Sequence, residues 1–84
     1  KDLRDFQTAK RLFYESLKRS QNQDQTFKYA LYGLAQSQEQ LGEFADALES
    51  YKTLHTLAVR HMDGSLVEKA SNEIAILSVK SRKQ

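Results

Sequence analysis

The sequence predicts an all-α fold of about four helices, packed as antiparallel helix-turn-helix hairpins. Ala, Leu, Glu, Gln, Lys and Arg, which are among the better helix formers, dominate the composition. The chain has no proline and only three glycines, so it contains few of the residues that interrupt helices. Apolar residues also recur at helical spacing in four stretches, separated by polar or glycine-bearing breaks. Together these observations favour a few long helices.

The first two predicted helices are separated by a polar segment, residues 20–25, that has nothing to bury and is expected to form a loop. The first helix runs from about Asp2 to Arg19, and its apolar face contains Leu3, Phe6, Ala9, Phe13 and Leu17. The second begins near Thr26, with Asp24 or Thr26 as its N-cap. It ends at Gly42, because glycine readily adopts the left-handed conformation that terminates helices. Its apolar residues are Ala30, Leu31, Leu34, Ala35 and Leu41.

The third predicted helix begins at about Glu43 or Phe44 and ends near His61. Its apolar face contains Phe44, Ala47, Leu48, Tyr51, Leu54 and Ala58. Residues 62–64 break the chain. Ser65 and Glu68 then have the spacing of a capping box, in which the hydroxyl and the carboxylate each satisfy a free amide. The fourth helix carries Val67, Ala70, Ile74 and Leu77, and residues 80–84 are expected to form a basic, frayed tail.

Length and charge restrict the function classes. The 84 residues are enough for one domain, 1–84, and the start at Lys1 suggests a piece of a longer protein. The net charge is +2 with both signs interspersed, whereas a nucleic-acid-binding domain more often has a basic stripe. The sequence shows no apolar run of the roughly 18 residues that a membrane span needs, and no signal peptide. There is no cysteine for disulfides or thiolate metal sites. The compartment stays unknown, with a cytoplasmic location favoured.

The centre of the chain resembles a tetratricopeptide repeat (TPR). The matching window, Lys28 to His61, has the 34-residue period of that family, and its most specific segment is GEFADALESYKTL. Residues at the family's pattern positions are Leu31, Leu34, Ala35, Gly42, Phe44, Ala47 and Tyr51. The alanines would let the two helices of the hairpin approach closely, and the aromatic rings would fill the space between hairpins. The sequence departs from the pattern at Gln38, where tyrosine is usual, at Leu54, where alanine is usual, and in lacking a closing proline.

The flanking helices extend the resemblance. Phe6 lies 38 residues before Phe44, and the first helix repeats the pattern of a second-type TPR helix. Val67 lies 36 residues after Leu31, and the fourth helix fits a first-type helix that acts as a cap. The resemblance therefore implies a short right-handed superhelical stack. It also implies that the apolar face of the first helix around Leu3, Phe6 and Phe13 lacks a partner helix.

The resemblance implies a groove that binds a peptide or helix of a partner protein, because first-type helices line such a groove in TPR arrays. The groove positions in this sequence are Tyr29, Tyr32, Gln36, Glu39, Gln40 and Asn72. The two tyrosines have the chemistry of binding hot spots, and the glutamine amides suit a peptide backbone. Alternatively, both tyrosines pack against the first helix. The set of lysines, arginines and asparagines with which some family members hold a chaperone's C-terminal carboxylate is not evident.

No catalytic motif is visible, so we expect no enzyme activity and no cofactor. His55, His61 and Asp63 form a thin histidine-histidine-aspartate set, but the two histidines share no helix face, so no metal site is predicted. The favoured function is a protein-interaction module or scaffold segment with a protein or peptide partner, and neither nucleic acid nor membrane is expected to be one. Two alternatives are a homo-oligomer formed through the first helix and an accessory or regulatory domain of a larger protein.

Overall fold

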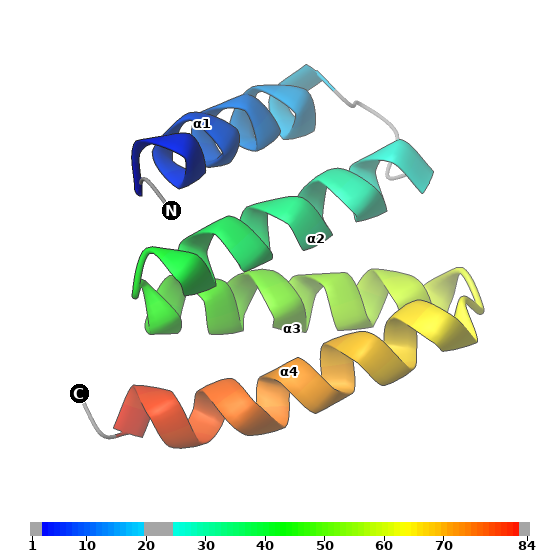
Figure 1. Ribbon diagram of the computed structural model, residues 1–84. Helices are drawn as coiled ribbons and strands as arrows, with labels where there is room; N and C mark the ends of the chain where they lie inside the picture. Colours follow the sequence, from blue (N-terminus) through cyan, green and yellow to red (C-terminus); the bar gives the residue numbers. More distant parts are fainter. Residues whose placement is uncertain (1–2, 20–24, 83–84) are drawn as a thin grey trace.

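The computed structural model describes residues 3–19 and 25–82. These residues form helices α1 (Leu3–Arg19), α2 (Gln25–Gln40), α3 (Phe44–Arg60) and α4 (Gly64–Arg82), and the described part of the chain contains no strand. The all-α prediction is therefore confirmed. The helices follow one another in chain order with alternating direction, each packed on its neighbour in the sequence (Figure 1).

The helix bounds agree closely with the sequence prediction except at the C-terminus. Helix α4 continues through Arg82, so residues 80–82 of the predicted basic tail belong to the helix. Lys80 is helical and lies over Phe44, with its Nζ 5.5 Å from the ring centroid. This contact joins the last turns of α4 to the start of α3. Residues 20–24, including the predicted cap Asp24, and residues 83–84 lie outside the described residues, as do the side chains of Leu3 and Thr26.

Two turns of similar geometry separate α2, α3 and α4. At the first, Gly42 has a φ of 79°. Its N–H donates to the Glu39 carbonyl and the Glu43 N–H donates to the Gln38 carbonyl, which are the two hydrogen bonds of a Schellman motif. The end of α2 at Gly42 is therefore confirmed. The second turn repeats both hydrogen bonds, but there the left-handed residue is Met62, with a φ of 56°.

The start of α4 differs from the predicted capping box. The helix already includes Gly64 and Ser65, so Ser65 lies too far inside it to act as the N-cap. Asp63 takes that place, because its Oδ1 accepts a hydrogen bond from the Leu66 N–H at 3.3 Å. The left-handed conformation of Met62 ends α3 two residues before Gly64, so the new helix begins directly after Asp63.

The core lies between α2, α3 and α4. Its buried residues are Leu31, Leu34, Ala35, Ala47, Tyr51, Leu54, Leu57, Ala58, Leu66, Ala70 and Leu77. Ala35 and Ala47 are fully buried, which is the environment expected of small residues where two helices approach closely. Leu54 is also fully buried. Helix α3 provides the largest share of the core because it has α2 on one side and α4 on the other.

The apolar face of α1 packs against α2, so the expectation that it lacks a partner is wrong. Phe13 and Leu17 are partly buried against the core. The Phe13 ring fills the space above Gly33, where an added Cβ would lie within 2.4–2.7 Å of three ring atoms. Near the middle of α1, Lys10 Nζ lies 2.9 Å from Oε1 of Glu43, the residue before α3. Among the α1 side chains that the structure describes, the large apolar ones that are exposed are Leu12 and Tyr14.

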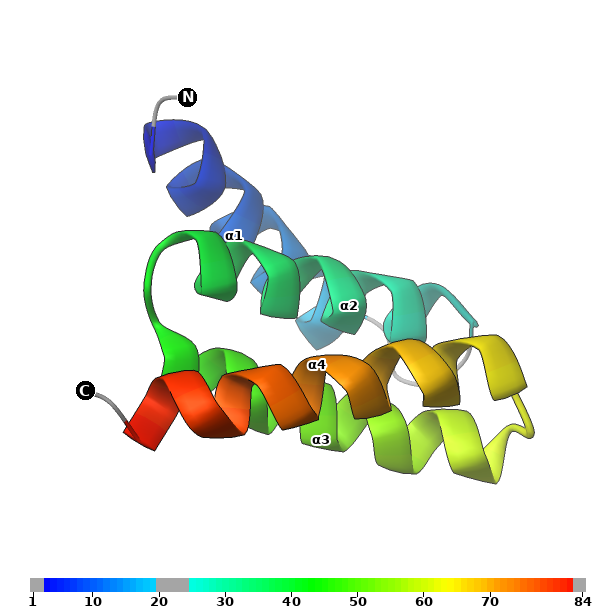
Figure 2. The same ribbon diagram turned by 60° about the horizontal axis from the view of Figure 1, so that its bottom comes forward.

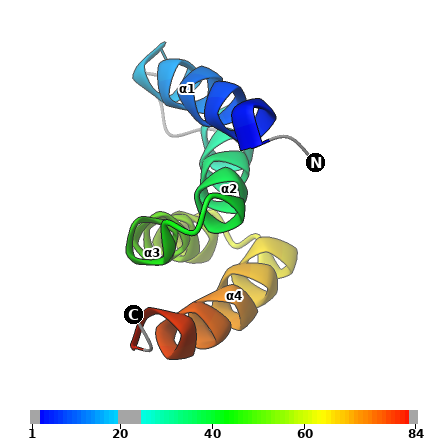
Figure 3. The ribbon, with the colours of Figure 1, turned by 60° about the vertical axis from the view of Figure 1, so that its left-hand side comes forward.

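Helices α2 and α4 run in the same direction, with α3 between them and displaced to one side (Figures 2 and 3). Two consecutive antiparallel hairpins produce this arrangement, because each three-residue turn reverses the chain. The first turns of α2 and α4 therefore lie at the same end of the molecule, and so do their last turns. Side chains of these two helices can meet although α3 separates them in the sequence.

Candidate functional site

Charged side chains link α2 to the N-cap of α4 at one end and to α4 itself at the other. At the N-terminal ends, Lys28 Nζ lies 3.4 Å from Asp63 Oδ2, and the Lys28 side chain is only 2% exposed. At the C-terminal ends, Lys80 Nζ lies 3.8 Å from Glu39 Oε2. Lys28 is thus a structural residue, buried beneath the surface that the sequence analysis assigned to partner binding.

Between these links and near the C-terminal ends lies an open cleft of about 520 Å³. It is lined by Phe6 of α1, by Gln36, Glu39 and Gln40 of α2, and by Glu73 of α4. Three of the six predicted groove residues thus line one cleft, together with side chains from two other helices. Gln36 and Gln40 are exposed residues, so this side of the cleft is accessible to a ligand.

The carboxyl side chains of Glu39 and Glu73 both line this cleft. The pKa of the Glu73 carboxyl is raised, first by burial and then by the nearby negative charge of Glu39. The Tyr51 hydroxyl, reaching from α3, donates to Glu39 Oε1 over 3.4 Å. Burial, followed by the nearby carboxylates Glu39 and Glu73, raises the pKa of the Tyr51 phenol far above its usual value. Tyr51 therefore remains a neutral hydrogen-bond donor beneath the cleft.

The remaining predicted residues differ in their surroundings. Tyr29 is 55% exposed on α2. Tyr32 is partly buried and contacts Tyr51 edge to face, with ring centroids 6.1 Å apart. The tyrosines therefore do not act as a pair: one is open to solvent, and the other packs into the hairpin, against α3. Asn72 is exposed but does not line the cleft, whereas its neighbour Glu73 does.

A buried polar pair lies close to the cleft. Ser50 Oγ donates a hydrogen bond of 2.7 Å to Gln38 Oε1, and both side chains are buried. The buried Gln38 amide thus has a hydrogen-bond partner on α3. Phe6, Glu73, Lys80 and Tyr51 were not among the predicted site residues. The signal for Glu73 was its position seven residues before Lys80 and three after Ala70, on the buried side of α4.

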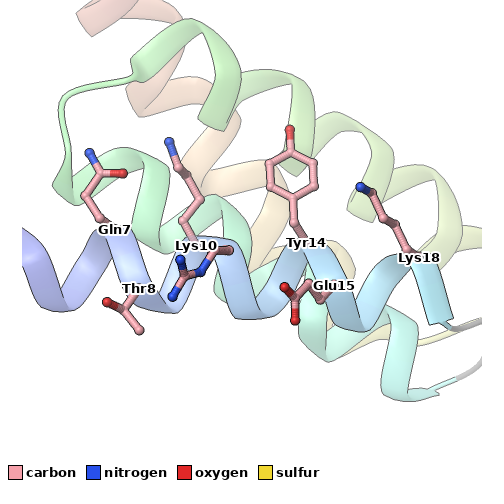
Figure 4. A pocket seen from close by; sticks show the side chains of 7 residues that line it. Gln7, Thr8, Lys10, Tyr14, Glu15 and Lys18 are labelled. Atoms are coloured by element: carbon pink, nitrogen blue, oxygen red, sulfur yellow. The ribbon is translucent and has the colours of Figure 1, made fainter.

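A second hollow, of about 600 Å³, lies along α1 (Figure 4). Its lining residues are Gln7, Thr8, Lys10, Arg11, Tyr14, Glu15 and Lys18. All of them belong to α1, and Figure 4 shows Lys10, Tyr14 and Lys18 projecting to the same side of the helix. Since no other helix contributes a side chain, this hollow does not bring groups together from different elements as the cleft does.

Neither a metal centre nor a membrane span is found in the described part of the chain. No group of three or more His, Cys, Asp or Glu side chains there could hold a metal ion. Asp63, the carboxylate of the histidine-histidine-aspartate set, instead contacts Lys28 and the Leu66 amide. Within residues 3–19 and 25–82, none of the helices is both long and apolar enough to cross a bilayer.

Comparison with known proteins found no relative of this chain. No family model, no curated protein and no solved structure matches this chain. The assignment of a function therefore depends on the cleft and on the arrangement of the helices.

Proposed function

We propose that this chain is a protein-interaction module of the TPR kind, which binds a peptide or a helix of a partner protein in the cleft between α2 and α4. The observation that carries the proposal is the convergence of Gln36, Glu39 and Gln40 with Glu73 and Phe6 in one open cleft. These residues come from three helices, and they combine amides, carboxyl groups and an aromatic ring. Such a mixture suits a peptide, whose backbone needs hydrogen-bond partners and whose side chains need contact area.

The arrangement of the helices supports the TPR part of this proposal. Helices α2 and α3 occupy the window 28–61 that resembles the repeat, and α2 and α4 run in the same direction, as successive first-type helices do in such arrays. Tyr29 extends the proposed binding surface along α2 toward its N-terminal end. Its flat ring with a polar tip is of the type enriched at binding hot spots.

The proposal is tested by selecting ligands from a phage-displayed peptide library with the purified chain, and then titrating a selected peptide into ¹⁵N-labelled protein. We expect amide shifts around residues 36–40 and 73. The double variant Gln36→Ala/Gln40→Ala should weaken binding roughly tenfold or more, because two hydrogen bonds of about 1 kcal/mol each are lost. These glutamines are exposed, so the variant should retain the wild-type helix content.

The matched control is Thr53→Ala/Thr56→Ala, which alters two exposed residues of α3 that do not line the cleft. This control should bind the peptide as the wild type does. The proposal is wrong if the selected peptides shift α1 or α3 instead of α2 and α4, or if both double variants bind equally well.

Self-association is a second candidate function, because apolar side chains remain exposed on the two outer helices. Leu12 is 56% and Tyr14 48% exposed on α1, and Ile76 and Val79 are exposed on α4. Exposed apolar residues on neighbouring turns often mark an interface. Light scattering over a wide concentration range tests this candidate. A constant monomer mass would exclude it, whereas a mass that rises with concentration and falls back in Leu12→Glu would support it.

A further inference from the structure

Helix α1 carries the net positive charge of the chain. Its 17 residues include five lysines and arginines against two acidic residues, which gives the helix a formal charge of +3. The whole chain has a formal charge of only +2, so the rest of the chain is slightly acidic. The charge of the molecule is therefore distributed unevenly, and α1 is the element toward which a negatively charged partner is attracted.

The exposed side of α1 has side chains at the spacing of a helix-helix contact. Phe13 and Leu17 pack toward the core. The residues on the other side that are exposed and line the hollow of Figure 4 include Gln7, Arg11, Tyr14 and Lys18, here called the α1 stripe. They follow one another at intervals of four, three and four residues, the spacing with which one helix meets another along its length. At 1.5 Å per residue the stripe is about 16 Å long, or roughly three turns.

Two cations of the α1 stripe are available to a partner. Lys10, beside the stripe, is already paired, because its Nζ lies 2.9 Å and 3.0 Å from the two carboxylate oxygens of Glu43. Arg11 and Lys18 are exposed, and neither forms an ion pair with a residue in the described part of the chain. They are seven residues apart on one face of the helix, and Tyr14 lies between them. An aromatic ring thus separates two unpaired positive charges.

We propose that the α1 stripe binds an acidic amphipathic helix of a partner protein. Arg11 and Lys18 pair with two carboxylates that are about seven residues apart on the partner helix. The Tyr14 ring contacts an apolar side chain between those carboxylates. This inference goes beyond the proposed binding of a peptide in the cleft, because the hollow along α1 and the cleft between α2 and α4 share no lining residue.

Glu15 distinguishes this surface from a nucleic-acid site. Its carboxylate lines the same hollow as Arg11 and Lys18, where it repels a phosphate backbone that is negatively charged along its whole length. A helix can carry charges of both signs, so its acidic residues match the two cations while a lysine or arginine matches Glu15. Exposed ion pairs contribute little each and are screened by salt, so we expect modest affinity that falls as the salt concentration rises.

The test uses two synthetic helical peptides of identical composition. In the matched peptide, two glutamates seven residues apart flank a leucine on one helix face. In the scrambled peptide, the same residues are distributed around the helix so that no face is acidic. Each peptide is titrated at low salt into the ¹⁵N-labelled protein. We expect the matched peptide to shift the amides of residues 7–18 and to bind about tenfold more tightly than the scrambled one.

Charge reversal tests the two cations directly. Arg11→Glu/Lys18→Glu should weaken binding of the matched peptide by about tenfold or more, and should bind a reversed peptide that has lysines in place of the two glutamates. The matched control, Lys52→Glu/Lys69→Glu, changes the net charge equally at two exposed lysines outside the hollow. It should bind the matched peptide as the wild type does. Circular dichroism should give both variants the wild-type helix content, because all the altered side chains are exposed.

Several results would overturn the proposal. If the matched and scrambled peptides bind equally, or if both double variants weaken binding to the same extent, binding follows net charge alone. The proposal is also refuted if the reversed peptide does not bind Arg11→Glu/Lys18→Glu. Oligothymidylate that shifts residues 7–18 at lower concentration than the matched peptide would identify a nucleic-acid surface instead. Shifts at residues 36–40 and 73 in place of 7–18 would refute this proposal while supporting the one for the cleft.

Discussion

Gly42 and Met62 occupy equivalent positions in the two turns, but they differ in conformational strain. Gly42 and Met62 both end a helix in the left-handed conformation and both have the hydrogen bonds of a Schellman motif. Glycine adopts this conformation without a steric penalty, whereas a residue with a Cβ pays about 1–2 kcal/mol. Burial of the Met62 side chain offsets little of this cost, because the side chain is 90% exposed. The turn between α3 and α4 therefore carries strain that the turn between α2 and α3 does not.

Replacing Met62 with glycine should stabilise the protein. We expect Met62→Gly to raise the free energy of unfolding by about 1 kcal/mol, because the left-handed strain disappears and no buried contact is lost. Urea denaturation followed by circular dichroism measures the change. Gly42→Ala provides the opposite case, since it introduces the same strain at the first turn and should cost about 1 kcal/mol. Equal stability of Met62→Gly and the wild type would show that Met62 is not strained.

Gly33 is a position where helix propensity and packing predict opposite effects. An alanine in the middle of α2 would favour the helix by about 1 kcal/mol. However, its Cβ would lie 2.4 Å from Phe13 Cζ, so the ring would have to leave its place against α2. Overpacking of this kind costs about 1–3 kcal/mol, so we expect Gly33→Ala to destabilise the protein.

The effects of helix propensity and of the clash at Gly33 can be separated by placing a smaller residue at position 13. In a Phe13→Leu background the clash is absent, and Gly33→Ala should become neutral or stabilising. Thermal unfolding of the four variants in this cycle measures the coupling. If Gly33→Ala is equally unfavourable with phenylalanine and with leucine at position 13, the ring contact is not its cause.

At the scale of secondary structure, the start of α4 combines capping and charge burial in one residue. Asp63 accepts a hydrogen bond from the Leu66 N–H and pairs with the buried Lys28. Loss of an N-cap costs about 1 kcal/mol, and removal of one partner of a buried ion pair costs about 3–5 kcal/mol. Because Asp63 is partly exposed, the second effect should lie at or below the lower end of that range.

We therefore expect Asp63→Ala to lower the free energy of unfolding by about 2–4 kcal/mol. Asp63→Ser keeps a side-chain acceptor for the Leu66 amide but removes the charge, so it should cost less than alanine by about 1 kcal/mol. Lys28→Met removes the buried charge, and the double variant Lys28→Met/Asp63→Ala should lose much less than the sum of the single changes. Additive losses in this cycle, measured by urea denaturation, would mean that Lys28 and Asp63 do not interact.

The sequence predicted the helices of this chain better than the orientation of the last one. Apolar spacing located all four helices, and Gly42 marked the end of α2. For α4, the predicted face of Val67, Ala70, Ile74 and Leu77 omitted Leu66, which is buried, whereas Val67 and Ile74 are only partly buried. Helix α4 is therefore turned slightly from the predicted orientation, and this turn brings Glu73 into the cleft. The apolar stripe is broad enough to allow either orientation, so only packing against α3 decides between them.

The candidate site was predictable on one helix and not across helices. Gln36, Glu39 and Gln40 share one face of α2, and the cleft includes all three. Phe6 and Glu73 come from helices whose positions depend on tertiary packing, which local periodicity does not encode. Tyr32 resembled Tyr29 in the sequence, yet its ring packs against Tyr51. Side chains on a common helix face could thus be predicted, whereas their partners from other helices could not.

At the scale of the whole molecule, stability should be highest at α3 and lowest at α1. Helix α3 has packed neighbours on two sides and contributes six buried residues: Ala47, Ser50, Tyr51, Leu54, Leu57 and Ala58. Helix α1 packs on α2, and of its residues 5–19, whose side chains are described, none is fully buried. Local opening requires less free energy where fewer apolar contacts must be broken. Helix α1 should therefore open without unfolding the other helices.

Amide hydrogen exchange followed by mass spectrometry tests this order. We expect the slowest exchange in α3, intermediate exchange in α2 and α4, and the fastest in α1, after correction for intrinsic rates. Phe13→Ala should accelerate exchange in α1 and leave α3 almost unchanged, because the ring contacts α2 at Gly33 but is not part of the buried core. If all four helices exchange at one common rate, and Phe13→Ala accelerates them equally, the molecule opens only as a single cooperative unit. In that case the contact between α1 and α2 is as essential to the fold as the core around Tyr51.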